Sequence, residues 1–369
     1  MESRVRPPGI FSFPGGMVGR PRESLGMSQV LVIGAGPAGL ATMASLAQQG
    51  IQARFVDRQG RPGGAYNWLH ERITLSSPAR WTSLPGLAIE TPGEYVTVAG
   101  YRDYLHHYAR HFELEPEPAE VTSLTVVEGG FEVDFGDHRQ HFQAVVTATG
   151  MDGLNWPDLP LGPNWMHSSQ WRGPDQLAAR RLLIIGRGVS AVEIAEESCR
   201  AGLKPTVSCR GQVKFSPQRL LGRDVHDYAF RLSWLPRWLA WGYCRKSPTF
   251  TGYDQDFRRF QQEGRLQVRP PVKTFEGKTA TFSDGSQAEF DLVVCATGYR
   301  YAMAYLPESV ARSPADGHPL GNQGESVNTP GLFLMGVHCA RGVSSQFLRG
   351  MAQDAPALAA TLRDRLEAP

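Results

Sequence analysis

One local pattern occurs twice in this chain and constrains its fold more than any other feature. In the first copy, an apolar run of strand length at 29–33 enters a glycine-rich turn at 34–39, and a helical pattern follows. In the second copy, a strand at 181–185 enters a similar turn at 186–191, again followed by a helix. Such a turn lets the backbone approach a pyrophosphate at the N-terminus of a helix. Two copies therefore predict two bound dinucleotides.

The segments after each copy also correspond. Residues 119–149 alternate apolar and polar side chains, as in an antiparallel meander, and this meander ends in an apolar run and Ala-Thr-Gly at 148–150. Residues 275–290 alternate in the same way before a second Ala-Thr-Gly at 296–298. We therefore expect an α/β chain of two Rossmann-like, three-layer ββα domains, the second inserted into the first. The expected divisions are a disordered tail at 1–26, a first domain at 27–155 and 286–369, and a second domain at 156–285.

Composition excludes several classes of protein. The chain is 41% hydrophobic and 20% charged with a formal net charge of +2, which gives no support to nucleic-acid binding. No apolar run has the length of a signal peptide or of a membrane span, so we expect a cytoplasmic protein. The five cysteines form no CxxC pair and no metal-ligand cluster. We expect them to be buried, inert thiols, and we predict no metal site.

The first copy carries the further features of a dinucleotide site. Asp57 ends the next strand, where its carboxylate can accept hydrogen bonds from ribose hydroxyls. The segment 61–64, Arg-Pro-Gly-Gly, resembles the glycine pair that two-dinucleotide flavoproteins place against the flavin diphosphate, so the resemblance implies FAD. The predicted FAD-site residues are Gly34, Gly36, Pro37, Ala38, Gly39, Asp57, Arg58, Gly63, Gly64, Val121, Gly150 and Gly336.

The second copy differs in a way that bears on its ligand. Its third glycine is replaced by Ala191, and the strand after its helix ends in Cys209-Arg210 rather than in an acid. A guanidinium suits the 2′-phosphate of NADPH, whereas an acid would suit the 2′-hydroxyl of NADH. The alternative is that Arg210 is an ordinary surface residue. The predicted NADPH-site residues are Gly186, Gly188, Val189, Ser190, Ala191, Arg210, Lys214 and Gly298.

Four stretches together resemble small bacterial flavin-containing, class B-like monooxygenases, including those similar to plant auxin-producing enzymes. They are GAGPAGL at 34–40, LSSPARWTSLPGL at 75–87, GRGVSAVEIA at 186–195 and CATGYR at 295–300. The family fingerprint FxGxxxHxxx(W/Y/F) is half present, at His167 and Trp171. The resemblance implies that NADPH reduces FAD and that O₂ then forms a C4a-(hydro)peroxyflavin. This species would oxygenate a small nucleophilic, sulfur- or nitrogen-containing substrate.

Two polar residues are catalytic candidates within this resemblance. Ser76 occupies the stretch in which the family often has an Asn near the flavin, and Gln346 lies in a helix expected around 344–351, as a neighbour of the flavin ring. The helix would direct its N-terminus at the flavin ring.

Other functions remain open. An NADPH-dependent disulfide or quinone reductase is the main alternative, but its relatives carry a cysteine where this chain has Ala38, or a CxxC pair. A non-catalytic flavin sensor is a third possible function.

Trp234, Trp238 and Trp241 share one face of a helix within 228–253. That face could pack in the core, line a substrate channel, or make peripheral membrane contact through 228–246. The sequence gives no oligomeric state.

Overall fold

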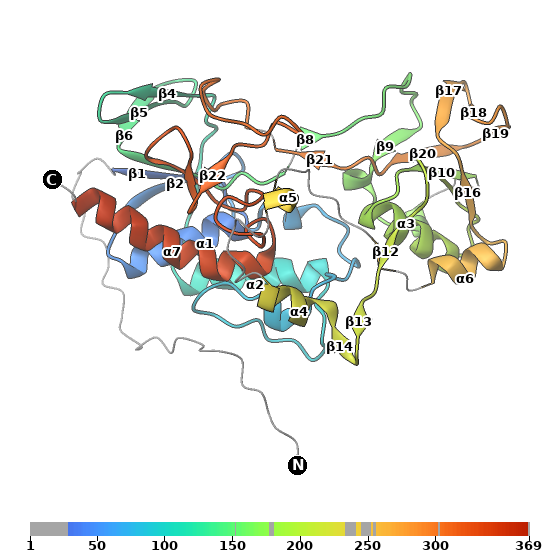
Figure 1. Ribbon diagram of the computed structural model, residues 1–369, viewed down its shortest axis with the longest axis horizontal. Helices are drawn as coiled ribbons and strands as arrows, with labels where there is room; N and C mark the ends of the chain where they lie inside the picture. Colours follow the sequence, from blue (N-terminus) through green and yellow to red (C-terminus); the bar gives the residue numbers. More distant parts are fainter. Residues whose placement is uncertain are drawn as a thin grey trace, which may run out of the picture.

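The computed structural model describes residues 29–151, 153–176, 181–232, 241–244, 252–253, 256–301 and 303–367. The expected tail at 1–26 lies outside these residues. Two parallel sheets lie side by side, and the chain passes from the first to the second and then returns (Figure 1). The predicted class, two Rossmann-like domains with one inserted into the other, is confirmed.

The first sheet has seven strands in the order β22-β23-β24-β7-β1-β2-β3. Its central strands β7, β1 and β2 are parallel, and β24 joins them in parallel from the C-terminal part of the chain. In sequence, β24 therefore comes after all the strands of the second domain, although it belongs to the sheet of the first domain. The bounds are β1 (Val30–Ile33), β2 (Ala53–Asp57), β3 (Glu117–Pro118), β7 (Ala144–Thr147), β22 (Gly321–Asn322), β23 (Glu325–Ser326) and β24 (Leu332–Leu334).

Each face of the first sheet is covered by a different layer. Three helices pack on one face around a shared apolar core, and α7 runs along α1 (Figure 1). They are α1 (Pro37–Gln48), α2 (Val98–His111) and α7 (Leu348–Glu367). An antiparallel meander covers the other face, as the alternation predicts, but it ends at Phe142, because the last residues of the expected stretch, 144–147, form the parallel strand β7. Its strands are β4 (Ser123–Val127), β5 (Gly130–Asp134) and β6 (Arg139–Phe142).

The second sheet repeats this arrangement in the order β16-β11-β10-β20-β9, and all its pairs are parallel. Its strands are β9 (Trp165–His167), β10 (Leu182–Ile185), β11 (Thr206–Ser208), β16 (Gln267–Arg269) and β20 (Leu292–Cys295). Helices α3 (Val189–Arg200) and α6 (Phe257–Gln262) cover one face. The meander β17 (Val272–Glu276), β18 (Thr279–Phe282) and β19 (Gln287–Glu289) covers the other.

Short elements connect the domains. The antiparallel pair β8 (Gly153–Leu154) and β21 (Tyr299–Arg300) joins the two chain crossings between the sheets. The segment after β11 contains β12 (Phe215–Ser216), β13 (Arg219–Leu220), β14 (Arg223–Asp224), α4 (Val225–Leu232), α5 (Trp241–Cys244) and β15 (Gly252–Tyr253). Four 3-10 helices complete the described chain: η1 (Gly64–Asn67), η2 (Ala79–Trp81), η3 (Ser168–Gln170) and η4 (Pro174–Gln176).

The tryptophan face can be followed only in part. Trp234 and Trp238 lie outside the described residues, while Trp241 begins α5. The three proposed roles for this face therefore stay predictions. Within the described parts of the chain, no helix combines the length and the apolar character that a membrane span requires.

Helix α7 begins later than the sequence suggested. It starts at Leu348, whereas we expected helix from about residue 344. Ser345 Oγ accepts hydrogen bonds from the backbone N–H groups of Arg341 (3.1 Å) and Gly342 (2.9 Å). This side chain closes a turn of its own before the helix, so Gln346 belongs to the loop that connects β24 to α7.

Candidate dinucleotide sites and active site

The first glycine turn has no room for side chains. Gly34 has φ +102°, and a Cβ atom there would lie 2.7 Å from the carbonyl oxygen of Ala148. A Cβ atom on Gly39 would lie 1.8 Å from the carbonyl oxygen of Gly34, so α1 packs directly on the turn. Both contacts are with backbone, which cannot move aside cheaply.

The N-terminus of α1 is open to an anion. Gly36 is its N-cap residue and has no side chain to cap it, Pro37 and Ala38 open the first turn, and no acid lies there. Pro37 has no N–H, so the backbone N–H groups of Ala38 and Gly39 are those available to a phosphate. Gly63 donates its backbone N–H to the carbonyl of Ala35 (2.8 Å), which brings the glycine pair at 63–64 against the turn.

Asp57 supports this turn from the end of β2. Its Oδ2 accepts a hydrogen bond from the Ala35 backbone (2.9 Å), and its Oδ1 accepts one from Gln59 (2.8 Å). A carboxylate has about four acceptor positions, so ribose hydroxyls can still bind to it. Its position fits the predicted role, and the role itself stays a prediction.

The remaining FAD-site candidates lie in different surroundings. Arg58 is exposed directly after β2, while Val121 is 8% exposed within the core beneath the meander. A Cβ atom on Gly336, just after β24, would lie 3.3 Å from the Cβ atom of Ala38. Gly150 follows β7 with φ +72°. The carboxyl ends of β1, β7 and β24 thus meet at the glycine turn, which is where ligands bind in open parallel sheets.

The second glycine turn is built in the same way around β10 and α3. Gly186 has φ +150°, and a Cβ atom there would lie 2.2 Å from the carbonyl oxygen of Ala296. Gly188 is the N-cap residue of α3, again without a side-chain cap or an acid in the first turn, which begins with Val189 and Ser190. Gly298 follows β20 with φ +89°. The structure therefore offers a second anion site at a helix N-terminus.

The residues predicted to select between NADPH and NADH lie at the carboxyl end of β11. Arg210 and Lys214 are both exposed there. The backbone carbonyl of Arg210 accepts a hydrogen bond from Arg187 (3.0 Å), which itself lies within the glycine turn. Two guanidinium groups thus lie on segments next to the turn, and no acid ends β11.

A cavity of 330 Å³ lies between the two domains. Ser76, Leu75 and Tyr95 line it from the first domain, and Glu193 and Tyr253 line it from the second. The predicted catalytic residue Ser76 therefore lies at the domain interface, where its carbonyl accepts a hydrogen bond from Gln218 (3.1 Å). Gln346 is not among the residues that line this cavity.

Three glutamates line this cavity: Glu193, Glu196 and Glu197. The carboxylate of Glu193, unlike the other two, makes no hydrogen bond to any described residue. Its neighbour Glu197 binds His70 (2.9 Å) and the indole N–H of Trp171 (2.8 Å). Glu196 binds Arg200 (3.0 Å) and backbone N–H groups at the start of α6. Burial, followed by the charges of Glu196 and Glu197, raises the pKa of Glu193 to about 8. No local pattern in the sequence distinguishes this residue, because its neighbours across the cavity come from distant segments.

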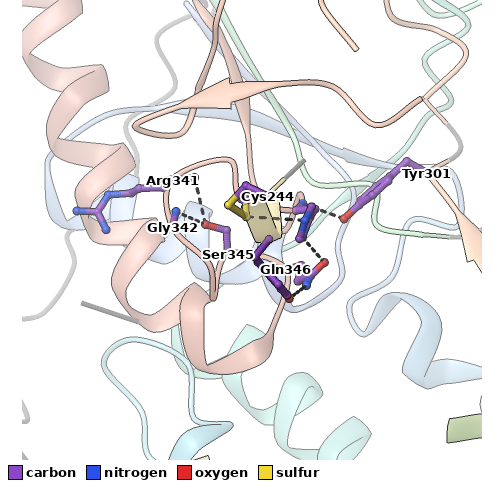
Figure 2. The surroundings of a disulfide bond; sticks show 9 residues. Cys244, Tyr301, Arg341, Gly342, Ser345 and Gln346 are labelled. Carbon is purple, nitrogen blue, oxygen red and sulfur yellow. Dashed lines mark hydrogen bonds between the residues drawn. A yellow bond between two sulfur atoms is a disulfide. The ribbon is translucent and has the colours of Figure 1, made fainter. Parts of the chain in front are cut away.

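Gln346 connects two parts of the chain (Figure 2). Its Oε1 lies 3.0 Å from Nδ1 of His338, and its Nε2 donates to the hydroxyl of Tyr243 in α5 (3.0 Å). Burial, with a smaller contribution from His318, lowers the pKa of His338. The amide therefore holds a neutral histidine on the loop after β24.

The expectation of five inert thiols is wrong for two of them. Cys244 at the end of α5 forms a disulfide with Cys339, 95 residues away, with a Cα–Cα distance of 5.7 Å (Figure 2). No spacing rule reveals such a pair, because the two segments meet only in the folded chain. The other three thiols are buried, and burial raises their pKa values, to about 11 for Cys199 and about 12 for Cys295.

His167 and Trp171 have packing roles in the structure. The side chain of His167 caps η3, and its Nε2 lies 3.2 Å from the carbonyl oxygen of Gly298. Burial lowers the pKa of His167. Trp171 is 1% exposed. Both residues therefore connect the second glycine unit to the segment that enters its domain.

Two open helix N-termini, each over a parallel sheet in its own domain, are typical of a protein that binds two dinucleotides. A family model described as pyridine nucleotide-disulphide oxidoreductase matches residues 31–223. The chain belongs to this family. The predicted oxidoreductase class and the use of a pyridine nucleotide are confirmed, and the predicted FAD and NADPH fit this family. No group of described residues forms a metal site.

Individual relatives agree with the predicted resemblance. The chain is 27% identical to an uncharacterized CzcO-like oxidoreductase of Geobacillus kaustophilus, over 88% of this chain and 95% of that protein. It is also 27% identical to the indole-3-pyruvate monooxygenase YUCCA8 of Oryza sativa subsp. indica, over 91% of this chain and 90% of that protein. A solved structure of a flavin-containing monooxygenase from Stenotrophomonas maltophilia superposes with a TM-score of 0.75 at 22% identity, covering 92% and 98% of the two chains.

Proposed function

We propose that this protein is an NADPH-dependent FAD monooxygenase that oxygenates a small sulfur- or nitrogen-containing nucleophile. The observation that carries the proposal is a cavity between two domains that each have a glycine turn at an open helix N-terminus. A substrate in this cavity contacts both the Ser76 segment of the first domain and α3 of the second. Similarity to monooxygenases over nine-tenths of the chain supports the same conclusion.

The residues of the chain supply binding and orientation. In this proposal, the open N-terminus of α1 and the glycine pair at 63–64 hold the FAD diphosphate, and Asp57 holds its ribose. The N-terminus of α3 holds the NADPH diphosphate, and Arg210 pairs with the 2′-phosphate. When bound, FAD supplies the redox chemistry by taking a hydride from NADPH and passing electrons to O₂.

The cavity restricts the substrate. Its volume of 330 Å³ is at the lower end of the range for small-molecule sites. Below about pH 8, the Glu193 carboxyl is mainly neutral and can donate a hydrogen bond to an acceptor on the substrate. Ser76 lines the same cavity from the first domain. We propose Ser76 as a polar positioning group for the substrate. Gln346 lies outside this cavity, and we propose it as a polar group near the flavin ring.

A reductase of disulfides or quinones is the second candidate. The disulfide between Cys244 and Cys339 and the description of the family favour it. Ala38 in the first turn argues against a reductase, because related small disulfide reductases carry a cysteine at this position.

We also propose a cytoplasmic location and peripheral membrane contact through residues 228–246.

Oxygen labelling separates these candidates. Purified holoenzyme is supplied with NADPH, ¹⁸O₂ and a panel of small thioethers, thiols and amines, and products are analysed by mass spectrometry. We expect at least one compound to gain a single ¹⁸O atom, with one NADPH consumed per product. NADPH oxidation that yields only hydrogen peroxide with every compound would contradict the proposal. Rapid anaerobic reduction of a disulfide or quinone, without oxygenation of any compound, would also contradict the proposal.

A further inference from the structure

Arg349 carries a positive charge for which the described part of the chain supplies no anion. It lies in the first turn of α7, and its side chain is half-buried. Its Nε atom is buried and has no hydrogen-bond partner, and no carboxylate of a described residue forms an ion pair with it. Burial lowers the pKa of Arg349, as expected for a cation whose charge is not balanced by an acid.

Another arginine of this chain shows what is missing at Arg349. Arg54 lies over the ring of Phe135, with its Cζ atom 4.4 Å from the ring centroid, and it also pairs with Glu117 (3.0 Å). Arg349 lies over the ring of Phe347 in the same way, at 4.1 Å, but without an acid. A ring contact recovers only a small part of the free energy that a charge loses when it leaves water. A bound anion would restore the balance.

Two tyrosines of the second domain lie within range of this charge. Burial raises the pKa of Tyr243 and the pKa of Tyr253, and the Arg349 charge acts in the opposite direction on both. Tyr253 also lines the interdomain cavity, and its hydroxyl lies 3.2 Å from Nε2 of His226. Arg349 does not line the cavity itself. Tyr253 therefore forms the boundary between the cavity and the guanidinium.

The segments around Arg349 are held in place by contacts within the protein. A Cβ atom on Gly350 would lie 2.1 Å from the carbonyl oxygen of Ser344, so the start of α7 packs directly on the turn before it. The hydroxyl of Tyr243 accepts a hydrogen bond from Nε2 of Gln346 (3.0 Å), which leaves its own hydrogen to donate. A ligand at Arg349 therefore finds its binding groups largely in position, which favours affinity.

A carboxylate on a small substrate is the anion that these observations favour. A guanidinium binds a carboxylate or a phosphate through two parallel hydrogen bonds. In the proposed function, the diphosphates of both dinucleotides bind at the N-termini of α1 and α3. The cavity of 330 Å³ beside Tyr253 has room for a small molecule. The anion that remains to be placed is therefore one carried by the substrate.

We propose that Arg349 binds a carboxylate of the substrate, so that the enzyme acts on small organic acids that also carry the sulfur or nitrogen to be oxygenated. This inference rests on the proposed function and narrows its substrate class. The guanidinium pairs with the two carboxylate oxygens, and the hydroxyl of Tyr243 donates a further hydrogen bond. The rest of the substrate extends past Tyr253 into the cavity. Arg349 is thus a binding residue that selects anionic over neutral substrates.

Calorimetric titration of the oxidised holoenzyme with matched probes tests the inference. The probes are methylthioacetate and phenylthioacetate, each compared with its primary amide, which has nearly the same shape and no charge. We expect the wild type to bind at least one carboxylate ~30-fold more tightly than its amide. Arg349→Met should abolish this preference. Arg363→Met is the matched control, because it removes an arginine from the same helix that pairs with Asp364 (2.9 Å), and it should keep the preference.

Thermal unfolding without added carboxylate provides a second measurement. Arg349→Met removes a buried charge that has no acid partner, so its Tm should rise by about 2–4 °C. Its FAD content and its affinity for NADP⁺ should not change. A lower Tm would show that Arg349 has a structural role. Loss of FAD or weaker binding of NADP⁺ would show that the guanidinium holds a cofactor phosphate. Either result would overturn the inference.

The outcomes separate the inference from the proposed function. Equal binding of carboxylates and amides, or no binding of either at millimolar concentration, would overturn the carboxylate site. Oxygenation of neutral thioethers by the same preparation would then leave the proposed function intact. Carboxylate binding that depends on Arg349, without oxygen transfer to any bound probe, would support the site and contradict the proposed monooxygenase.

Discussion

The two glycine turns perform the same task with different tolerances. In the first, α1 packs so closely that a Cβ atom on Gly39 would come within 1.8 Å of backbone. In the second, the equivalent residue is Ala191, whose side chain is accommodated at 1% exposure. The first turn is also supported by Asp57 and by the glycine pair at 63–64, whereas exposed Arg210 follows the strand next to the second. We infer that the first site is built to retain its cofactor and the second to exchange it.

The largest effect is expected for Gly39→Ala in the first turn. Its methyl group would collide with the carbonyl of Gly34, so α1 must move and the phosphate cradle opens. We expect FAD affinity to fall by about 3 kcal/mol, or ~100-fold. The flavin content of purified protein measures this. Gly50→Ala is the control, because the Cβ atom added there would have no atom within 4 Å, and it should purify yellow. If Gly39→Ala kept its full FAD content, the first turn would tolerate alanine as the second does, and the proposed difference between the two sites would be wrong.

Gly186→Ala is the reciprocal change in the second turn, and it should weaken NADPH binding without affecting FAD binding. Its Cβ atom would lie 2.2 Å from the carbonyl oxygen of Ala296, so the second turn is distorted while the first is untouched. We expect FAD to be retained and NADPH affinity to fall by about 2 kcal/mol, or ~30-fold. Dithionite should still bleach the flavin. Gly202→Ala, with no atom within 4 Å, should behave like the wild type. Loss of FAD from Gly186→Ala would show that the sites are not independent.

Arg210→Ala sharpens the assignment of the second ligand. Removal of a charge-assisted hydrogen bond to a 2′-phosphate should raise the KM for NADPH by ~10-fold, corresponding to about 1.5 kcal/mol. The KM for NADH should stay unchanged, because NADH has no such phosphate. Lys204→Ala removes an exposed cation at the other end of β11 and serves as the control. Equal changes for both nucleotides would mean that Arg210 is an ordinary surface residue.

Glu193→Gln should change the pH dependence of stability. The pKa of Glu193 is raised to about 8 in the folded protein by burial and by Glu196 and Glu197. The folded state therefore binds more protons than the unfolded state between about pH 4.5 and 8. The wild type should lose stability across this interval as pH rises, by about 1–3 kcal/mol. The variant should lose correspondingly less in urea unfolding. Parallel stability curves for the two proteins would contradict the buried, ionisable position of Glu193.

Sequence reasoning predicted the parts of this molecule that are local. Each glycine turn, its flanking strand and helix, and the acid at the end of β2 depend on residues close together in the chain, and all are found where expected. The two meanders followed from alternation in the same way.

The parts that were missed depend on contacts between distant segments. Glu193 becomes unusual only because segments at 72–76 and 253 enclose it. Cys244 and Cys339 are ordinary residues until α5 docks on the loop after β24. The start of α7 was placed too early because the side chain of Ser345 closes a turn that helix periodicity does not reveal.

Anaerobic mixing of the purified protein with NADPH, followed through the visible absorbance of the flavin, tests most directly whether the two sites form one enzyme. We expect a yellow protein with one FAD per chain whose flavin bleaches within one turnover and more slowly with NADH. A colourless protein that cannot be reconstituted with FAD, or a bound flavin that NADPH leaves oxidised, would contradict the assignment of both glycine turns.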